Sequence, residues 1–403
     1  MRRFGSRVLL DSPGIESRGH RSRLFDAVVP GVGLAASWFF SLLFSVEADH
    51  RVLIPCLDGR SHFSHTRTFE VRCARDDSSG GLMSSHTHAS EIRLMQLLAC
   101  PEDHSVLQLR QNVLVCRDGH TFQFEQDIPI FAKAPRHELI PGNMGPCEYQ
   151  RNGSTVDPFV NDWIVNTNGN LYWSLRGKLP RYPIPQWPLQ AGGGETVVDV
   201  GCSWGRWSIA AAQAGYHPIG VDVHVDALAA AARVAKQLGA EADFVCADAD
   251  RLPFLSQSVD AVFSYSVLQH LERSVVCRFF AEAQRILKPG GVCLVQLPNR
   301  FGVFSFLQQL RRGFREANTG SFEMRYWSRN QIAAAVRSAG LSMPDIRADG
   351  FLSQNPQASD LDFLPGNAKM IVALSEKGRR AAAVFPVLTY FADSLWIQAR
   401  AGD

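Results

Sequence analysis

The sequence predicts an α/β protein: a mainly parallel sheet, preceded by a small β module. From about residue 191, short apolar runs alternate with helical stretches, which is typical of βαβ units. The loop after the first of these runs is rich in glycine, and residues 91–133 instead show apolar and polar residues in alternation. A content of 46% hydrophobic and 20% charged residues excludes a disordered or fibrous chain.

Residues 1–82 differ from the rest of the chain in charge. They hold 11 Arg, no Lys and nine acidic residues. The uncharged run 27–46 is long enough to span a bilayer, so a membrane anchor is one interpretation. The other is a non-native or disordered leader with Met83 as the start, because residues 50–82 follow no helical or strand period. We expect the second, and a membrane-anchored protein only if residues 27–46 are present in the mature chain.

Charge and cysteine usage restrict the partners and the compartment. Residues 83–403 hold 30 basic and 30 acidic residues, a balance that disfavours nucleic acid as a partner. The nine cysteines are odd in number and widely spaced, so they do not form a disulfide framework. We therefore expect reduced thiols and a cytoplasmic protein.

Residues 91–133 predict short strands and two pairs of candidate metal ligands. Apolar residues at period two surround a turn at Gln111-Asn112, and they are Leu107, Leu109, Val113 and Val115. Two Cys-x3-His spacings supply four ligands of the type that a tetrahedral zinc ion prefers, namely Cys100, His104, Cys116 and His120.

This module resembles the small zinc-ribbon-like domain that accompanies some tRNA and translation-factor methyltransferases. The resemblance rests on Cys100-Pro101 and on Cys116-x-x-Gly119-His120, followed by Phe122 and by Asp127-Ile128-Pro129. That family's zinc form has two Cys-x-x-Cys pairs, and here Asp103 and Gly119-His120 replace the second cysteines. A metal-free module with two buried thiols is therefore the alternative to a zinc site, and the alternative we favour. Residues 134–190 are expected to form a linker and a cap, since they are rich first in Pro, Gly and Asn and then in aromatic residues.

The domain 191–403 is expected to hold seven strands. Apolar runs predict the first five at 196–200, 218–223, 242–248, 259–266 and 292–298, and the last two at 341–351 and 391–401. Helices are expected after the first, second and fourth strands. Ser328 and Gln331 have the spacing of a capping box, which predicts a helix that ends before Gly340.

Three features follow the first three strands and predict a nucleotide-like ligand. The loop at Gly201–Gly205 turns tightly and brings backbone close to a ligand. Asp222 ends the second strand about 20 residues later, where a carboxylate accepts ribose hydroxyls. Asp248-Ala249 ends the third strand, where Asp can accept from an adenine amino group. Ser203 and Arg206 stand where a nicotinamide-dinucleotide fold requires glycine, which disfavours that class.

Taken together, these segments resemble class I S-adenosylmethionine-dependent methyltransferases of the methyltransferase type 11 group. The motifs VVDVGCSWGRW, IGVDV, CADADRLPF, VDAVFSYSVLQHL and RILKPGG occur in that order. The resemblance implies a Rossmann-like, mostly parallel sheet of seven strands whose last strand is antiparallel. It also implies S-adenosylmethionine as the cofactor, bound across the carboxyl edge of the sheet.

The resemblance implies a role for each residue at this edge. Four residues would line the methionine end of the cofactor: Asp199, Gly201, Cys202 and Gly205. Asp222 would hold the ribose. The adenine would lie against Asp248 and Ala249, and the sulfonium against Ser264 and Tyr265. Ser203 stands where the family usually has glycine, so its side chain must point away from the cofactor or contact it through the hydroxyl.

The expected chemistry is in-line displacement at a sulfonium methyl group. His270 is the candidate base for an acceptor that must lose a proton, and a structural histidine is the alternative. The expected acceptor is a small molecule or a lipid- or glycan-linked molecule. The segment with Arg311, Arg312 and Arg315 would form a lid, contact a membrane surface or simply face solvent. RNA methylation and a non-catalytic cofactor-binding homologue are the competing functions.

Overall fold

The computed structural model describes residues 93–136, 155–315, 324–352 and 357–402. Contacts divide the chain into residues 1–79 and residues 80–403, and every described residue belongs to the second unit. The predicted leader, its apolar run 27–46 and Met83 lie outside the described residues. Within the described part of the chain, no helix is long and apolar enough to cross a bilayer.

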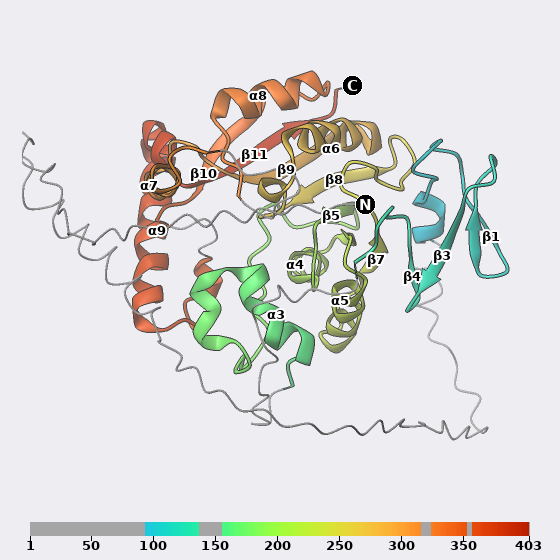
Figure 1. Cartoon of the computed structure of the whole chain (residues 1–403), viewed down its shortest axis with the longest axis horizontal. Helices are drawn as coiled ribbons and strands as arrows, with labels where there is room; N and C mark the ends of the chain where they lie inside the picture. Colours follow the sequence, from blue (N-terminus) through green and yellow to red (C-terminus); the bar gives the residue numbers. More distant parts are fainter. Residues whose placement is uncertain (1–92, 137–154, 316–323, 353–356, 403) are drawn as a thin grey trace, which may run out of the picture. The chain divides into compact units, whose positions relative to one another are not determined.

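A seven-stranded sheet forms the centre of the main domain, with strand order β10-β11-β9-β8-β5-β6-β7 (Figure 1). Its strands are β5 (Thr196–Val200), β6 (His217–Asp222), β7 (Asp243–Cys246), β8 (Val259–Ser264), β9 (Leu287–Pro298), β10 (Asp345–Gly350) and β11 (Ser394–Arg400). The first five are parallel, whereas β11 pairs antiparallel with both β9 and β10. The predicted fold class and the antiparallel last strand are therefore confirmed.

Helices cover both faces of this sheet because its central strands are apolar on both sides. All five residues of β5 are buried. The helices α6 (Arg273–Ile286) and α8 (Arg329–Ser338) share one core cluster with the sheet. The helices α3 (Pro158–Asn168), α4 (Arg206–Gln213) and α5 (Val225–Gln237) pack in the cluster on the opposite face (Figure 1). Two further helices, α7 (Val303–Arg311) and α9 (Gly366–Val384), follow β9 and β10.

The element boundaries differ from the predictions mainly at β9 and β10. The Lys288–Gly291 segment, expected as a turn, lies inside β9, and Gly290 adopts a φ of 73° there. A register irregularity between Val259 and Ala261 accommodates this segment in the ladder with β8. The strand expected at 341–351 is reduced to β10, and Leu341 forms only an isolated bridge with Ala401.

The small module is an antiparallel sheet of β1 (Gln108–Arg110), β2 (Val113–Val115), β3 (Thr121–Glu125) and β4 (Ile128–Pro129). Gln111 and Asn112 form the predicted turn with φ of 47° and 63°, as a tight hairpin requires. Leu109 is 55% exposed, and the other residues of the edge strand β1 are also exposed, so Leu109 does not belong to the core. Leu107 and Leu114 are the residues that the hairpin contributes to the core.

The predicted capping box opens α8. The Ser328 hydroxyl accepts from the Gln331 amide at 3.2 Å, and the Gln331 side chain accepts from the Ser328 amide at 2.9 Å. We expect Ser328→Ala to lower the free energy of unfolding by about 1 kcal/mol, because the substitution removes an N-cap acceptor. Ser338→Ala, at the exposed end of the same helix, is the control and should change it by less than about 0.5 kcal/mol. Chemical denaturation measures both, and equal effects would contradict the assignment.

Candidate active site

The glycine loop between β5 and α4 is closed by backbone hydrogen bonds to the neighbouring strand. The Gly201 and Cys202 amides donate to the Val221 carbonyl at 2.6 and 3.1 Å. Gly201 has a φ of 81°, and a Cβ atom there would lie 2.2 Å from the Val267 side chain. Both the backbone conformation and this close contact therefore require glycine at position 201.

Ser203 takes up the left-handed conformation that glycine usually adopts. Its φ is 48°, and its amide donates to the Asp222 carboxylate at 2.9 Å. The Ser203 hydroxyl is buried and has no hydrogen-bond partner among the described residues. A buried hydroxyl without a partner is costly, so this atom is a candidate contact for a bound ligand.

Two carboxylates at the ends of β6 and β7 are held in place by backbone amides. Asp222 accepts from the Ser203 amide and, at 3.0 Å, from the His224 amide. Asp248 accepts from the Lys133 amide at 3.0 Å, and Arg251 lies 3.5 Å from the same oxygen. Because parallel strands end at the same edge, both carboxylates lie beside the glycine loop.

Asp199, near the end of β5, is 1% exposed and accepts from the Ser208 hydroxyl at 2.7 Å. Burial, assisted by the nearby charge of Asp222 and opposed by the Ser208 hydrogen bond, raises the pKa of this carboxyl to about 7. The site therefore holds a carboxyl group that keeps its proton to a higher pH than an ordinary aspartate does.

Three residues expected at the cofactor also contribute to the scaffold. The Cys202 thiol is buried beside Gly220, where a Cβ atom would lie 2.8 Å from the sulfur. Burial raises the pKa of this thiol well above its usual range, so it stays protonated. The Ser264 hydroxyl donates to the Val200 carbonyl at 2.8 Å, and so links the ends of β8 and β5. Ala249 is partly buried and packs against the main core cluster.

Tyr265 belongs to a buried polar network at the end of β8. Its hydroxyl donates to Asp349 at 2.9 Å and accepts from Gln357 at 2.5 Å. The Ser394 hydroxyl also donates to Asp349, at 2.6 Å. Burial raises the pKa of Asp349 to about 6. The Tyr265 ring packs on Trp207, with ring centroids 4.7 Å apart. The hydrogen bonds of its hydroxyl and the packing of its ring therefore both fix the Tyr265 side chain.

Arg206, the first residue of α4, is a site residue that sequence reasoning missed. It is 6% exposed and lies 3.5 Å from the Asp360 carboxylate, yet its Nε and Nη2 atoms make no hydrogen bond among the described residues. Burying a guanidinium with unused donors is costly unless a ligand completes its partners. A positive charge at a helix N-terminus opposes the helix dipole, and this was the available sequence signal.

His270 ends the short 3₁₀ helix η3 (Leu268–His270) that follows β8. Its carbonyl accepts from Arg325 at 3.0 Å, and its Nε2 atom lies 3.5 Å from the Gln269 side-chain amide. Val267, which packs on Gly201, begins the same segment. The segment that carries His270 therefore begins at a residue that packs on the glycine loop.

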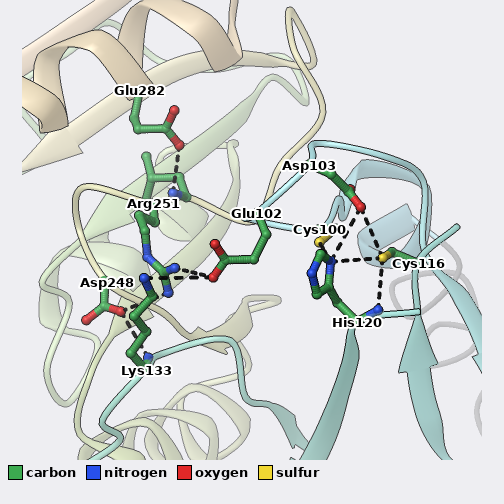
Figure 2. A network of polar contacts seen from close by, with 10 residues as sticks. Cys100, Glu102, Asp103, Cys116, His120, Lys133, Asp248, Arg251 and Glu282 are labelled. Carbon is green, nitrogen blue, oxygen red and sulfur yellow. Dashed lines mark hydrogen bonds and ion pairs between the residues drawn. The ribbon is translucent and has the colours of Figure 1, made fainter. Parts of the chain in front are cut away.

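In the small module, the structure brings together three of the four predicted metal ligands. Cys100, Cys116 and His120 lie close together, and Asp103 occupies the fourth position (Figure 2). His104 is exposed and lies outside this group. His104 has a φ of 58° and follows Asp103 in the same turn. At this turn the predicted Cys-x3-His pair is therefore replaced by a Cys-x2-Asp pair, Cys100 and Asp103.

Comparison with known proteins agrees with this geometry. A family model described as a methyltransferase domain matches residues 197–291, which run from β5 into β9. Residues 197–291 are therefore similar to a methyltransferase domain, within a sheet of Rossmann-like topology, and this match supports S-adenosylmethionine as the cofactor.

Particular relatives share this domain. The chain is 30% identical over 145 residues to the biotin biosynthesis bifunctional protein BioHC of Cellvibrio japonicus, covering 36% of this chain and 27% of the relative. It is 30% identical over 165 residues to the malonyl-[acyl-carrier protein] O-methyltransferase of a Methylovorus strain, covering 39% and 53%. It thus spans about half or less of these two relatives.

Among solved structures, magnesium protoporphyrin IX methyltransferase from Synechocystis, with bound S-adenosylhomocysteine, has 15% sequence identity and a TM-score of 0.36. The match covers 52% of this chain and 75% of that one.

The buried Asp199 makes stability depend on pH. Its folded-state pKa of about 7 lies above its ordinary value of 3.8, so the folded chain binds the extra proton between these values. Without cofactor, the free energy of unfolding should therefore fall as pH rises from about 4 to about 7. Asp199→Asn cannot titrate and should show a shallower fall, by a few kcal/mol across this window.

Denaturation at several pH values measures this difference. Asp345→Asn, at an exposed position of β10, is the control and should keep the wild-type dependence. Parallel pH profiles for Asp199→Asn and the wild type would contradict the raised pKa.

Proposed function

We propose that this chain transfers a methyl group from S-adenosylmethionine to a small-molecule acceptor. The observation that carries the proposal is the edge formed by β5, β6 and β7. There, Asp199 precedes a glycine loop that is hydrogen-bonded across to β6, and Asp222 and Asp248 follow at the ends of the next two strands. Fixed carboxylates at successive strand ends are suited to the hydroxyl and amino groups of an adenosine.

The residues at this edge fit the chemical groups of the cofactor. Asp222 contacts the amides of Ser203 and His224 and, at 3.0 Å, the His224 Nδ1 atom, and an ionised carboxylate, with about four lone-pair positions, keeps acceptor capacity beyond these contacts. We assign it to the ribose, and Asp248 with Ala249 to the adenine. The unpaired donors of Arg206 and the hydroxyl of Ser203 suit the methionine carboxylate. Asp199, Gly201, Cys202 and Gly205 then form the wall and floor beneath the methionine.

When bound, S-adenosylmethionine supplies the methyl group and the leaving group for an in-line displacement. The chain's own contribution is to orient the two reactants and to exclude water. Ser264 and Tyr265, at the end of β8, are assigned to the sulfonium end. His270 is assigned to hold the proton that a hydroxyl, amine or acid acceptor releases.

The acceptor is proposed to lie where the cap and the C-terminal insert meet α4. Asp360, from the insert, pairs with Arg206, and burial raises the pKa of the Asp360 carboxyl. Burial raises the pKa of the Tyr172 phenol in the cap. The charge of Asp360 acts in the same direction, and the charge of Arg206 acts in the opposite direction. The O-methyltransferase relative is named for malonyl-[acyl-carrier protein], which supports a small or carrier-linked acceptor.

Lipid- or glycan-linked acceptors remain within the proposal. Phe306 and Leu310 on α7 are 43% and 54% exposed, beside the exposed Arg311 and Arg312. This combination supports contact with a membrane surface when a lipid-linked acceptor is bound. The equal numbers of basic and acidic residues in 83–403 favour such acceptors over RNA.

Cofactor binding is the first test. Calorimetry with S-adenosylhomocysteine should give one site per chain, and Asp222→Ala should weaken binding at least about 30-fold, because two ribose hydroxyls lose a charged acceptor. Asp345→Ala, at an exposed carboxylate of β10, is the control and should bind like the wild type. Absence of binding to the wild-type chain would refute both methyl transfer and the non-catalytic cofactor-binding alternative.

The role of His270 is tested by kinetics with an acceptor found by screening for S-adenosylhomocysteine release. For an acceptor that loses a proton, His270→Asn should lower kcat by about 10²- to 10⁴-fold and leave the KM for S-adenosylmethionine unchanged. Ser274→Ala, at an exposed position in the first turn of α6, is the control and should keep the wild-type kcat. A rise in that KM with constant kcat would instead show that His270 only shapes the pocket.

A further inference from the structure

Four metal-ligating side chains converge on one point in the small module (Figure 2). They are Cys100, Asp103, Cys116 and His120, which we call the thiol cluster, and their ligand atoms all lie within 4.8 Å of one another. Two turns supply them. The first turn lies between Ala99 and Val106, which form an isolated strand bridge, and it holds Cys100 and Asp103. The second turn connects β2 to β3 and holds Cys116 and His120.

Four of the separations between these ligand atoms are close to those of a tetrahedral zinc site. The His120 Nδ1 atom lies 3.5 Å from Cys100 Sγ and 3.3 Å from Cys116 Sγ. The nearer Asp103 oxygen lies 3.2 Å from Cys116 Sγ and 3.5 Å from His120 Nδ1. Zinc bonds of about 2.0 to 2.3 Å at tetrahedral angles would separate neighbouring ligand atoms by about 3.3 to 3.8 Å.

Backbone contacts orient the ligands toward the centre of the cluster. The Ser105 amide donates to one Asp103 oxygen at 2.8 Å, which directs the other oxygen toward Cys116. The His120 amide donates to Cys116 Sγ at 3.3 Å, and Gly119 permits this turn with a φ of 88°. Such secondary contacts hold metal ligands in a productive orientation. Two sulfurs, an imidazole and a carboxylate favour zinc over magnesium or calcium.

The turn that carries the first two ligands also reaches the edge assigned to the cofactor. Glu102, between Cys100 and Asp103, forms an ion pair with Arg251, and Arg251 lies 3.5 Å from Asp248 (Figure 2). On the other side, the Lys133 amide donates to Asp248 at 3.0 Å. Two segments of the small module therefore hold the carboxylate that is assigned to the adenine.

Backbone pairing connects the module firmly to the same region. The Ala99 amide donates to the Pro253 carbonyl at 2.9 Å, and the Phe131 amide donates to the Cys246 carbonyl at 2.7 Å. Cys100 and Cys116 are buried in the same core cluster as the sheet. A change in the order of the first turn is thus transmitted to Asp248 through a short, packed path.

We propose that the thiol cluster binds one zinc ion, and that this ion fixes the turn from which Glu102 holds Arg251 beside Asp248. Zinc binding and cofactor binding are then coupled, and each raises the affinity for the other by the same factor. The metal site stands independently, whereas the coupling rests on the function proposed above.

Metal content of the full chain tests the site. Protein dialysed against zinc and then against metal-free buffer should hold about one zinc per chain by elemental analysis. Cobalt(II) in its place should give the visible absorption of a tetrahedral site and thiolate charge-transfer bands. His120→Ala should lose the ion without disturbing the core, since this side chain is 46% exposed. His104→Ala, at an exposed neighbour of Asp103, is the matched control and should keep it.

The coupling is tested by the affinity for S-adenosylhomocysteine. Removal of zinc by a chelator should weaken this affinity about five-fold in the wild type. Glu102→Gln should still bind one zinc, but its affinity should no longer respond to the chelator. A wild-type chain without zinc and without a cobalt spectrum would overturn the site. Equal affinities with and without zinc would overturn the coupling alone.

No binding of S-adenosylhomocysteine to either form would overturn the proposed function and the coupling with it. The zinc stoichiometry would still decide the site.

Discussion

The hydrogen bond from the Ser203 amide to the Asp222 carboxylate is the interaction on which the candidate active site depends. It joins the glycine loop after β5 to the end of β6, at 2.9 Å. The parallel pairing of the two strands brings these ends together, and the contacts of the Gly201 and Cys202 amides with Val221 close the loop over them. Without this hydrogen bond, the Asp222 carboxylate and the glycine loop would not be fixed relative to each other, and a ligand could not contact both at once.

The site also concentrates groups whose burial is unfavourable for folding. Among the residues that the structure describes, Asp199 has no countercharge in hydrogen-bond contact, and two donor atoms of the Arg206 guanidinium make no hydrogen bond. Such groups cost free energy in the unliganded chain, and a ligand that completes their interactions recovers part of it. Asp199 lies near the carboxyl end of β5 and Arg206 opens α4, at the end of the sheet where ligands of this fold class bind.

The regular parts of the fold could be predicted because each depends on local patterns. Buried parallel strands are continuous apolar runs, so β5 was predicted at its observed bounds, and the capping box at Ser328 is a local hydrogen-bond motif. The ion pair between Arg206 and Asp360 could not be predicted, because Asp360 comes from an insert more than 150 residues away. Spacing also suggested His104 as a metal ligand, whereas the turn directs Asp103 inward instead.

We propose that the edge of β5, β6 and β7 holds S-adenosylmethionine through its fixed carboxylates. A crystal structure of the full chain with S-adenosylhomocysteine tests it most directly. The account predicts ribose hydroxyls within hydrogen-bond distance of Asp222, and the adenine amino group within that distance of Asp248. A ligand bound elsewhere, with Asp222 in contact only with Ser203 and His224, would contradict it.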